Sequence, residues 1–154
     1  MENKNIHERE IILGSGGDSL LPFVLMYMAY ISLHGHLSPG GGFQGGVLFV
    51  AAILLIYFGH GREVTSKAVS FNLLHKGEGL ASVVYVALAL MGVAVGAQFC
   101  ENILYTHGNI GDLYSSGTIF WMNVTVGVKV LTGIGSITLL MLSILAERNG
   151  GEEI

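Results

Sequence analysis

The sequence predicts an all-α, polytopic membrane protein with four transmembrane helices and both termini in the cytoplasm. The 154 residues are 51% hydrophobic and only 12% charged, with a mean hydropathy of +0.62. This charged fraction is about half that of an ordinary soluble domain. The charged residues leave four stretches nearly free of charge, and each is close to the length of about 20 residues that a helix needs to cross a bilayer. A soluble enzyme is therefore excluded.

The four membrane segments are expected at 18–35, 42–59, 80–100 and 118–146. The first is short, and Asp18 or Ser19 is suited to cap it, with Pro22 in its first turn, where a missing N–H costs no hydrogen bond. The third contains no charged residue, and the fourth is long enough to cross the bilayer at a tilt. We expect a tail at 1–17, a membrane domain at 18–148 and a second tail at 149–154.

The basic residues predict the orientation. Six of the seven lie outside the four segments: Lys4, Arg9, Arg62, Lys67, Lys76 and Arg148. With four segments these six share one side, whereas the opposite loops, 34–41 and 101–117, contain no lysine or arginine. The positive-inside rule then places both termini in the cytoplasm. The N-terminal tail lacks the order of a cleavable signal peptide, so we expect it to remain on the mature protein.

Composition also limits the ligands. The net charge of −4 and the absence of a basic tail exclude nucleic acid as a partner. Cys100 is the single cysteine, so the chain has neither an internal disulfide nor a paired redox motif, and we expect a small buried apolar residue there. His34 and His36 have no evident third ligand, so a capped turn is favoured over a metal site. We expect no cofactor on this chain.

The densest local pattern runs from His34 to Gly46. It lacks the Lys-Ser/Thr end of a phosphate-binding loop and follows no strand, which excludes a phosphate cradle. Gly41 with Gly45, and Gly42 with Gly46, have the spacing that lets two membrane helices approach closely. The pattern therefore predicts a tight turn leading into a closely packed helix.

The same stretch resembles the signature G-H-x-x-P-G-G-G-F-x-G-G of the MnhB (MrpB) subunits of the Mrp-type multisubunit sodium/proton antiporters. The matching residues are Gly35, His36, Pro39, Gly40, Gly41, Gly42, Phe43, Gly45 and Gly46. The resemblance covers about residues 18–148, and related subunits occur in archaeal membrane-bound hydrogenases and sulfane reductases. It implies a multi-pass subunit in the plasma membrane of a prokaryote. It also implies other membrane subunits as partners, and Na⁺ and H⁺ as transported ions.

Lys129 is the principal candidate for a functional residue. It lies about 16 Å from the outer end of the fourth segment, near the bilayer middle. An ammonium there costs a few kcal/mol unless it faces protein, water or a counter-charge. Because lysine titrates readily when desolvated, Lys129 is predicted to relay protons or to set the field along a cation path. The alternative is a structural pair with an acid of another subunit, since we expect no acid of this chain at matching depth.

Three other polar residues are weaker candidates for the cation path: His36, Gln44 and Glu101. Each is also typical of a helix cap or a solvated end charge. Glu78 is interpreted as simple helix-start electrostatics before the third segment. Asn123-Val-Thr125 matches a glycosylation acceptor but lies within a predicted membrane segment, where it cannot be modified.

No nucleophile, base and orienting group cluster in the chain, so we expect no catalytic site of its own. The leading hypothesis is a non-catalytic membrane subunit of a cation-translocating complex, belonging either to an antiporter or to a redox-driven hydrogenase or sulfane reductase. The alternative is a purely structural scaffold that holds neighbouring subunits without lining an ion path.

Overall fold

The computed structural model describes residues 2–35, 40–105 and 115–150, with side chains over 11–35, 40–105 and 115–145. These residues form four helices and contain no strand: α1 (Glu2–His34), α2 (Gly42–Ala68), α3 (Phe71–Ala94) and α4 (Thr118–Gly150). Each contains a stretch long and apolar enough to cross a membrane: Ile11–His34, Gly42–Ala68, Phe71–Ala94 and Thr118–Leu145. The predicted all-α architecture with four membrane helices is confirmed.

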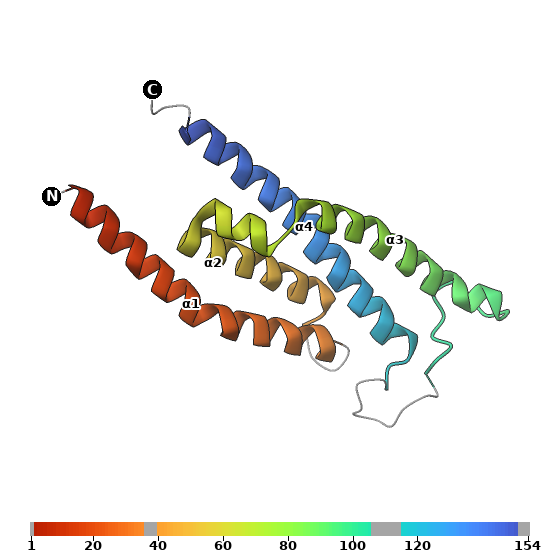
Figure 1. Cartoon of the computed structure of the whole chain (residues 1–154). Helices are drawn as coiled ribbons and strands as arrows, with labels where there is room; N and C mark the ends of the chain where they lie inside the picture. The colour runs from red at the N-terminus through yellow and green to blue at the C-terminus, as the bar shows by residue number, and fades with distance from the viewer. Residues whose placement is uncertain (1, 36–39, 106–114, 151–154) are drawn as a thin grey trace.

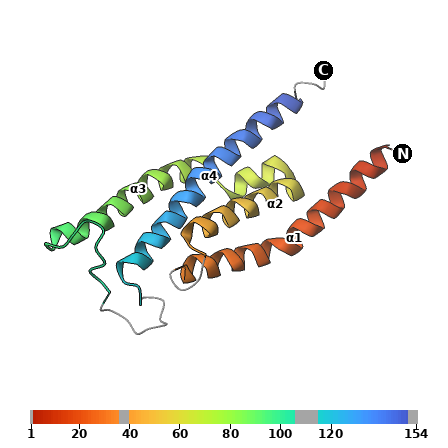
Figure 2. The same ribbon diagram turned by 180° about the vertical axis from the view of Figure 1, so that it is seen from behind.

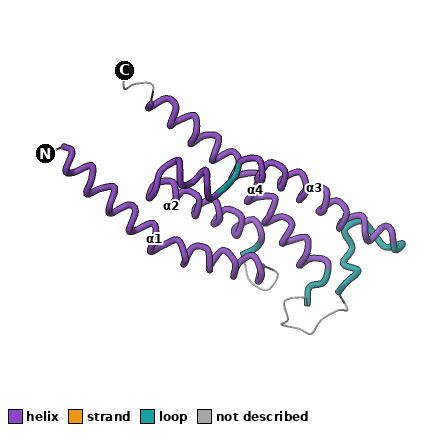
Figure 3. Tube along the Cα trace, in the orientation of Figure 1, coloured by secondary structure: helices purple, strands orange, loops and turns teal. Residues whose placement is uncertain are grey.

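The four helices lie side by side in the order α1, α2, α4, α3 (Figure 1). Both termini lie at one end of the bundle, and the view from behind shows the same arrangement (Figure 2). We call this the termini end. The last residues of α1 and α3 and the first residues of α2 and α4 lie at the opposite end, which we call the loop end (Figure 3). Helix α4 therefore separates α2 from α3.

Two helices begin earlier than the sequence predicts. Helix α1 begins at Glu2, so it runs through the expected tail, and Pro22 lies in its interior rather than in its first turn. Proline there removes the hydrogen bond to the carbonyl of residue 18, and α1 bends in its middle (Figure 1). Helix α3 begins at Phe71 rather than 80 and ends at Ala94 rather than 100. It ends where Gly96 adopts a left-handed backbone (φ 84°), as is typical of a helix C-terminus.

Helix α2 breaks near the termini end. Gly61 has φ 78° and ψ −175°, values that favour glycine, and the following turns fold back toward the bundle (Figure 1). We call this returning segment, residues 62–68, the hook. Its Thr65 is buried and donates a hydrogen bond from its hydroxyl to the carbonyl of Gly61 (2.9 Å). The connection between α2 and α3 is therefore a packed element rather than a free loop.

Glycines bring α2 against both of its neighbours. A side chain at Gly42 would collide with the carbonyl oxygen of Asn123 in α4, and one at Gly46 would lie 2.8 Å from the carbonyl oxygen of Gly127. Gly45 faces the other way, against the Ser32 hydroxyl of α1. The expectation that this stretch packs closely against neighbouring helices is thus confirmed, with three helices meeting at its backbone.

A single amide joins these three helices. The Asn123 Oδ1 accepts a hydrogen bond from the Gly42 N–H (2.7 Å), and its Nδ2 donates one to the Ser32 carbonyl (3.1 Å). The Gly42 N–H opens α2 and the Ser32 carbonyl lies in the last turn of α1, where a helix leaves such groups without intrahelical partners. In lipid each unpaired backbone group costs several kcal/mol. Asn123 therefore pairs a backbone group of α1 and one of α2, and so holds both helices against α4 at the loop end.

We predict that Gly42→Leu will destabilise the protein, because its side chain must displace the α4 backbone. The expected loss is about 2 kcal/mol or more in the free energy of unfolding. Gly79→Leu is the matched control, since a side chain at Gly79 meets nothing within 4 Å. Thermal unfolding of the purified full chain in detergent measures both. Equal melting temperatures for the two variants would contradict the close α2–α4 contact.

We also predict that Asn123→Ala will cost about 1 kcal/mol, the net value of such hydrogen bonds in membrane proteins. Asn123→Asp will also be less stable than the wild type, because an ionised carboxylate accepts from Gly42 but cannot donate to Ser32. The exposed Asn72→Ala serves as the control. The same thermal unfolding assay decides the matter: an Asp variant as stable as the wild type would show that the bond to Ser32 contributes nothing.

Candidate functional site: a polar seam between α3 and α4

Lys129 lies on the side of α4 that faces α3. Its Nζ donates a hydrogen bond to the Ser82 hydroxyl of α3 (2.5 Å). The side chain borders a cavity of about 320 Å³, whose other lining residues are Ser82, Tyr85, Val86, Thr125 and Val126. Among the described residues no carboxylate lies within ion-pairing distance of Nζ. An ammonium has three N–H donors, so this one retains capacity for further partners.

Glu78 lies one helical turn from this bond. It precedes Ser82 by four residues on α3, and its backbone carbonyl accepts a hydrogen bond from the Ser82 hydroxyl (2.9 Å). Its carboxyl group faces Gly133, where its carbon is 3.6 Å from the position a Cβ would take. Gly133 in turn follows Lys129 by four residues on α4. The antiparallel register thus places Ser82 beside Lys129 and Glu78 beside Gly133, so the carboxylate and the ammonium lie on successive turns.

We call Glu78, Ser82 and Lys129 the polar seam. It corrects the expectation that this chain places no acid near Lys129. It also corrects the interpretation of Glu78 as a helix-start charge, because α3 begins at Phe71 and Glu78 lies inside the helix, half-buried against α4. A charge-free criterion starts the third segment after Glu78 and so leaves out an acid that faces α4.

The other predicted path residues do not join the seam. The Gln44 Oε1 accepts the Gly41 N–H (2.8 Å) and so caps the start of α2. The Glu101 Oε2 accepts the Gln98 N–H (2.6 Å) in the turn after α3. Both side chains are exposed, and neither borders the cavity at Lys129. His36 lies outside the described residues.

Three glycines of the signature, Gly35, Gly41 and Gly42, surround Asn123. A side chain at Gly35 would lie 2.6 Å from the Asn123 Nδ2, and one at Gly41 would lie 2.9 Å from its Oδ1. Gly40 and Gly42 continue this turn, Phe43 is 55% exposed, and Pro39 lies outside the described residues. Sequence reasoning gave Asn123 no role. The available signal was an amide in an apolar helix near a glycine turn with unpaired backbone groups.

The described residues offer no site for a metal. In residues 11–35, 40–105 and 115–145, no three His, Cys, Asp or Glu side chains gather closely enough to bind an ion. The His34 Nδ1 lies 3.1 Å from the Tyr30 carbonyl, and its ring stacks on the Tyr30 ring. The single cysteine, Cys100, is exposed rather than buried, in contrast to its predicted place in the core. It lies at the loop end, just after α3, where the chain has left the helix.

Comparison with known proteins places the chain in a family. Residues 12–136 match the family model described as a domain related to the MnhB subunit of Na⁺/H⁺ antiporter. A chain of the membrane-bound sulfane sulfur reductase, an archaeal respiratory membrane complex, has a similar fold with a TM-score of 0.70 and 37% sequence identity. That match covers 86% of this chain and 57% of the reductase chain.

Three relatives extend this picture. An uncharacterised protein of Methanocaldococcus jannaschii is 32% identical over 114 residues, which cover 71% of this chain and 43% of that protein. A Na⁺/H⁺ antiporter subunit of Alkalihalophilus pseudofirmus is 32% identical over 69 residues, 45% of this chain and 48% of that relative. A putative antiporter subunit of Staphylococcus epidermidis is 27% identical over 150 residues, 92% of this chain and 99% of that one.

The chain thus spans less than half the length of the first two of these relatives. The family model nevertheless covers α2 and α3 whole and most of α1 and α4. With four membrane helices and antiporter-subunit relatives, this is a multi-pass protein of the plasma membrane. The chain belongs to the family of domains related to the MnhB subunit of Na⁺/H⁺ antiporters.

Proposed function

We propose that the chain is a non-catalytic membrane subunit of a cation-translocating complex, either a Mrp-type antiporter or a related redox-driven complex. Na⁺ and H⁺ are the transported ions, and the partners are other membrane subunits. Family membership and the 37% identity to a chain of a respiratory membrane complex support this proposal. The observation that carries it is the polar seam, an ammonium and a carboxylate on successive turns of two apolar helices.

The seam has the chemistry that a cation path requires. A carboxylate binds Na⁺ or a proton, and a nearby ammonium changes the free energy of each bound state through its charge. The Ser82 hydroxyl both donates to the Glu78 carbonyl and accepts from Lys129, so it links the two turns. Ionisable groups inside a membrane are expensive and are retained mainly for function.

A neighbouring subunit must complete the path. Lys129 is exposed at the surface of this chain, about 16 Å along α4 from Thr118. Contact with lipid there would cost several kcal/mol. Large apolar side chains beside the seam are also exposed, among them Val83 at 67% and Val86 at 53%. This face therefore suits a second membrane protein that supplies polar partners to the ammonium.

A purely structural scaffold is the second candidate. The backbone contact of α2 with α4 and the Asn123 amide favour it, because they give the subunit a rigid form without any ion. Under this alternative the seam is a static interface with a neighbour. Transport assays on variants of Glu78 and Lys129 distinguish the two functions.

We further propose that the termini end faces the cytoplasm. The single Cys100 is exposed just after α3, at the loop end, and so provides a natural probe. In intact cells a membrane-impermeant maleimide is expected to label Cys100. A Cys100→Ser, Lys67→Cys double variant, which moves the thiol to an exposed position on the hook, is expected to react only after the membrane is permeabilised. The opposite pattern would invert the topology.

Lys129→Ala is predicted to lower sodium-dependent proton transport in vesicles roughly tenfold or more, the effect of about 1.4 kcal/mol on a barrier. Glu78→Gln is expected to act in the same direction, because it removes the carboxylate. Lys67→Ala is the control, since this lysine pairs with Glu63 (2.7 Å) on the exposed hook. Unchanged transport by both seam variants in correctly assembled complexes would support the scaffold instead.

A further inference from the structure

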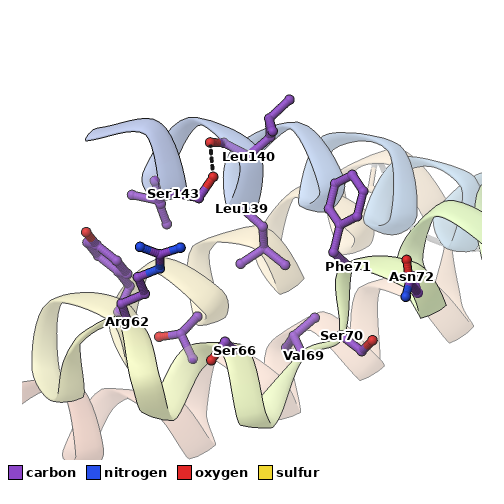
Figure 4. A pocket seen from close by; sticks show the side chains of 12 residues that line it. Arg62, Ser66, Val69, Ser70, Phe71, Asn72, Leu139, Leu140 and Ser143 are labelled. Carbon is purple, nitrogen blue, oxygen red and sulfur yellow. Dashed lines mark hydrogen bonds between the residues drawn. The ribbon is translucent and has the colours of Figure 1, made fainter. Parts of the chain in front are cut away.

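A second polar feature lies at the termini end, away from the seam. A cavity of about 450 Å³ opens between the hook, the start of α3 and the last turns of α4 (Figure 4). Arg62 and Ser66 of the hook border it on one side, and Leu139, Leu140 and Ser143 of α4 border it on the other. The break at Gly61 creates this cavity, because it turns the hook toward α4.

Arg62 gives the cavity a positive charge. Its guanidinium extends toward α4 in Figure 4. Among the described residues it has no carboxylate partner, whereas the neighbouring Lys67 pairs with Glu63 at 2.7 Å. The Ser70 hydroxyl, at the floor of the cavity, makes no capping bond to α3. A planar guanidinium with five N–H donors matches the oxygens of a phosphate group.

The rest of the cavity wall is mixed, with apolar side chains beside hydroxyl groups that are hydrogen-bonded to backbone carbonyls at Thr65, Ser66 and Ser143. Val69 follows α2, Phe71 opens α3, and Leu139 and Leu140 come from α4 (Figure 4). A free phosphate ion gains nothing from such a wall. An amphiphile with an anionic head and a hydrocarbon chain matches both the guanidinium and the leucines, since its chain packs on the same apolar side chains that bilayer lipid would otherwise contact.

The depth of the cavity suits a lipid headgroup. Helix α3 has 24 residues, which span about 36 Å against about 30 Å of hydrocarbon in a bilayer. Its first residues, which border the cavity, therefore lie at the boundary between hydrocarbon and water. Basic pockets between membrane helices at this level are typical sites for anionic lipid headgroups.

We propose that this cavity binds an anionic phospholipid, with the phosphate on Arg62 and an acyl chain along Phe71 and Leu139. The site is separate from the polar seam. The proposal is therefore the same whether the subunit transports ions or serves only as a scaffold. Its occupant comes from the leaflet on the side of the termini end. The lipid fills the space between the hook and α4 and so steadies the only broken helix among the described four.

Photolabelling tests the proposal. The full chain is reconstituted in phosphatidylcholine vesicles that contain phosphatidylglycerol with a photoactivatable acyl chain. Labelled peptides are expected to contain Phe71 or Leu139, and Arg62→Gln is expected to reduce this labelling roughly tenfold, the effect of one lost charge-assisted contact. Arg62→Lys, which keeps the charge but not the planar fork, should retain part of it.

The controls separate a lipid site from other occupants. Lys67→Gln removes the same charge from the same segment and should leave labelling unchanged, since Lys67 does not border the cavity. Equal labelling by photoactivatable phosphatidylcholine would overturn the proposal, as would displacement by free inorganic phosphate. So would a complex purified from native membranes in which this cavity crosslinks to a neighbouring subunit and takes up no lipid. Circular dichroism confirms that each variant keeps its helix content.

Discussion

The bundle depends on satisfying backbone groups at the loop end, where α1 ends and α2 begins beside α4. Asn123 does this with one side chain, since an amide both accepts and donates. The bond requires the backbones of α1, α2 and α4 to approach within hydrogen-bond distance of a short side chain. That approach is possible only where Cβ atoms are absent, which explains the glycines at 35, 41 and 42. These three glycines of the signature therefore form the surface that fits the Asn123 amide.

The position of α4 in the bundle follows from this constraint. Asn123 and Gly127 turn one side of α4 toward α2, and Gly127 packs directly on Gly42. Lys129 and Gly133 are then directed toward α3, because successive residues on a helix are rotated by about 100°. Packing one side of α4 against the glycines of α2 thus places Lys129 in the interface between α4 and α3. The amide at the loop end and the polar seam are two consequences of a single helix orientation.

Much of this fold follows from the sequence, and the exceptions have two causes. Charge-free stretches predicted the four helices, and the glycine spacing predicted close packing at 41–46. The same rule that found the helices misplaced α3, because Lys76 and Glu78 belong to a helix whose other faces are apolar. The break at Gly61 was not predictable from local pattern, and although an amide in an apolar helix was a visible signal, the partners of Asn123 depend on how α1 and α2 approach α4.

The separation of Glu78 from Lys129 bears on what the seam can do. A closed ion pair would satisfy both charges within the subunit, and such pairs serve structure as readily as function. Here the ammonium is hydrogen-bonded to a neutral hydroxyl, and the carboxylate lies one turn away, half-buried beside a glycine. Neither charge is neutralised by the other at contact distance, so the carboxylate keeps capacity for a proton or a cation, and the ammonium keeps N–H donors for a partner side chain. The two charges are not in direct contact, and none of the four described helices covers the face on which they lie. This arrangement is more consistent with an ion path shared with a neighbouring subunit than with a structural ion pair.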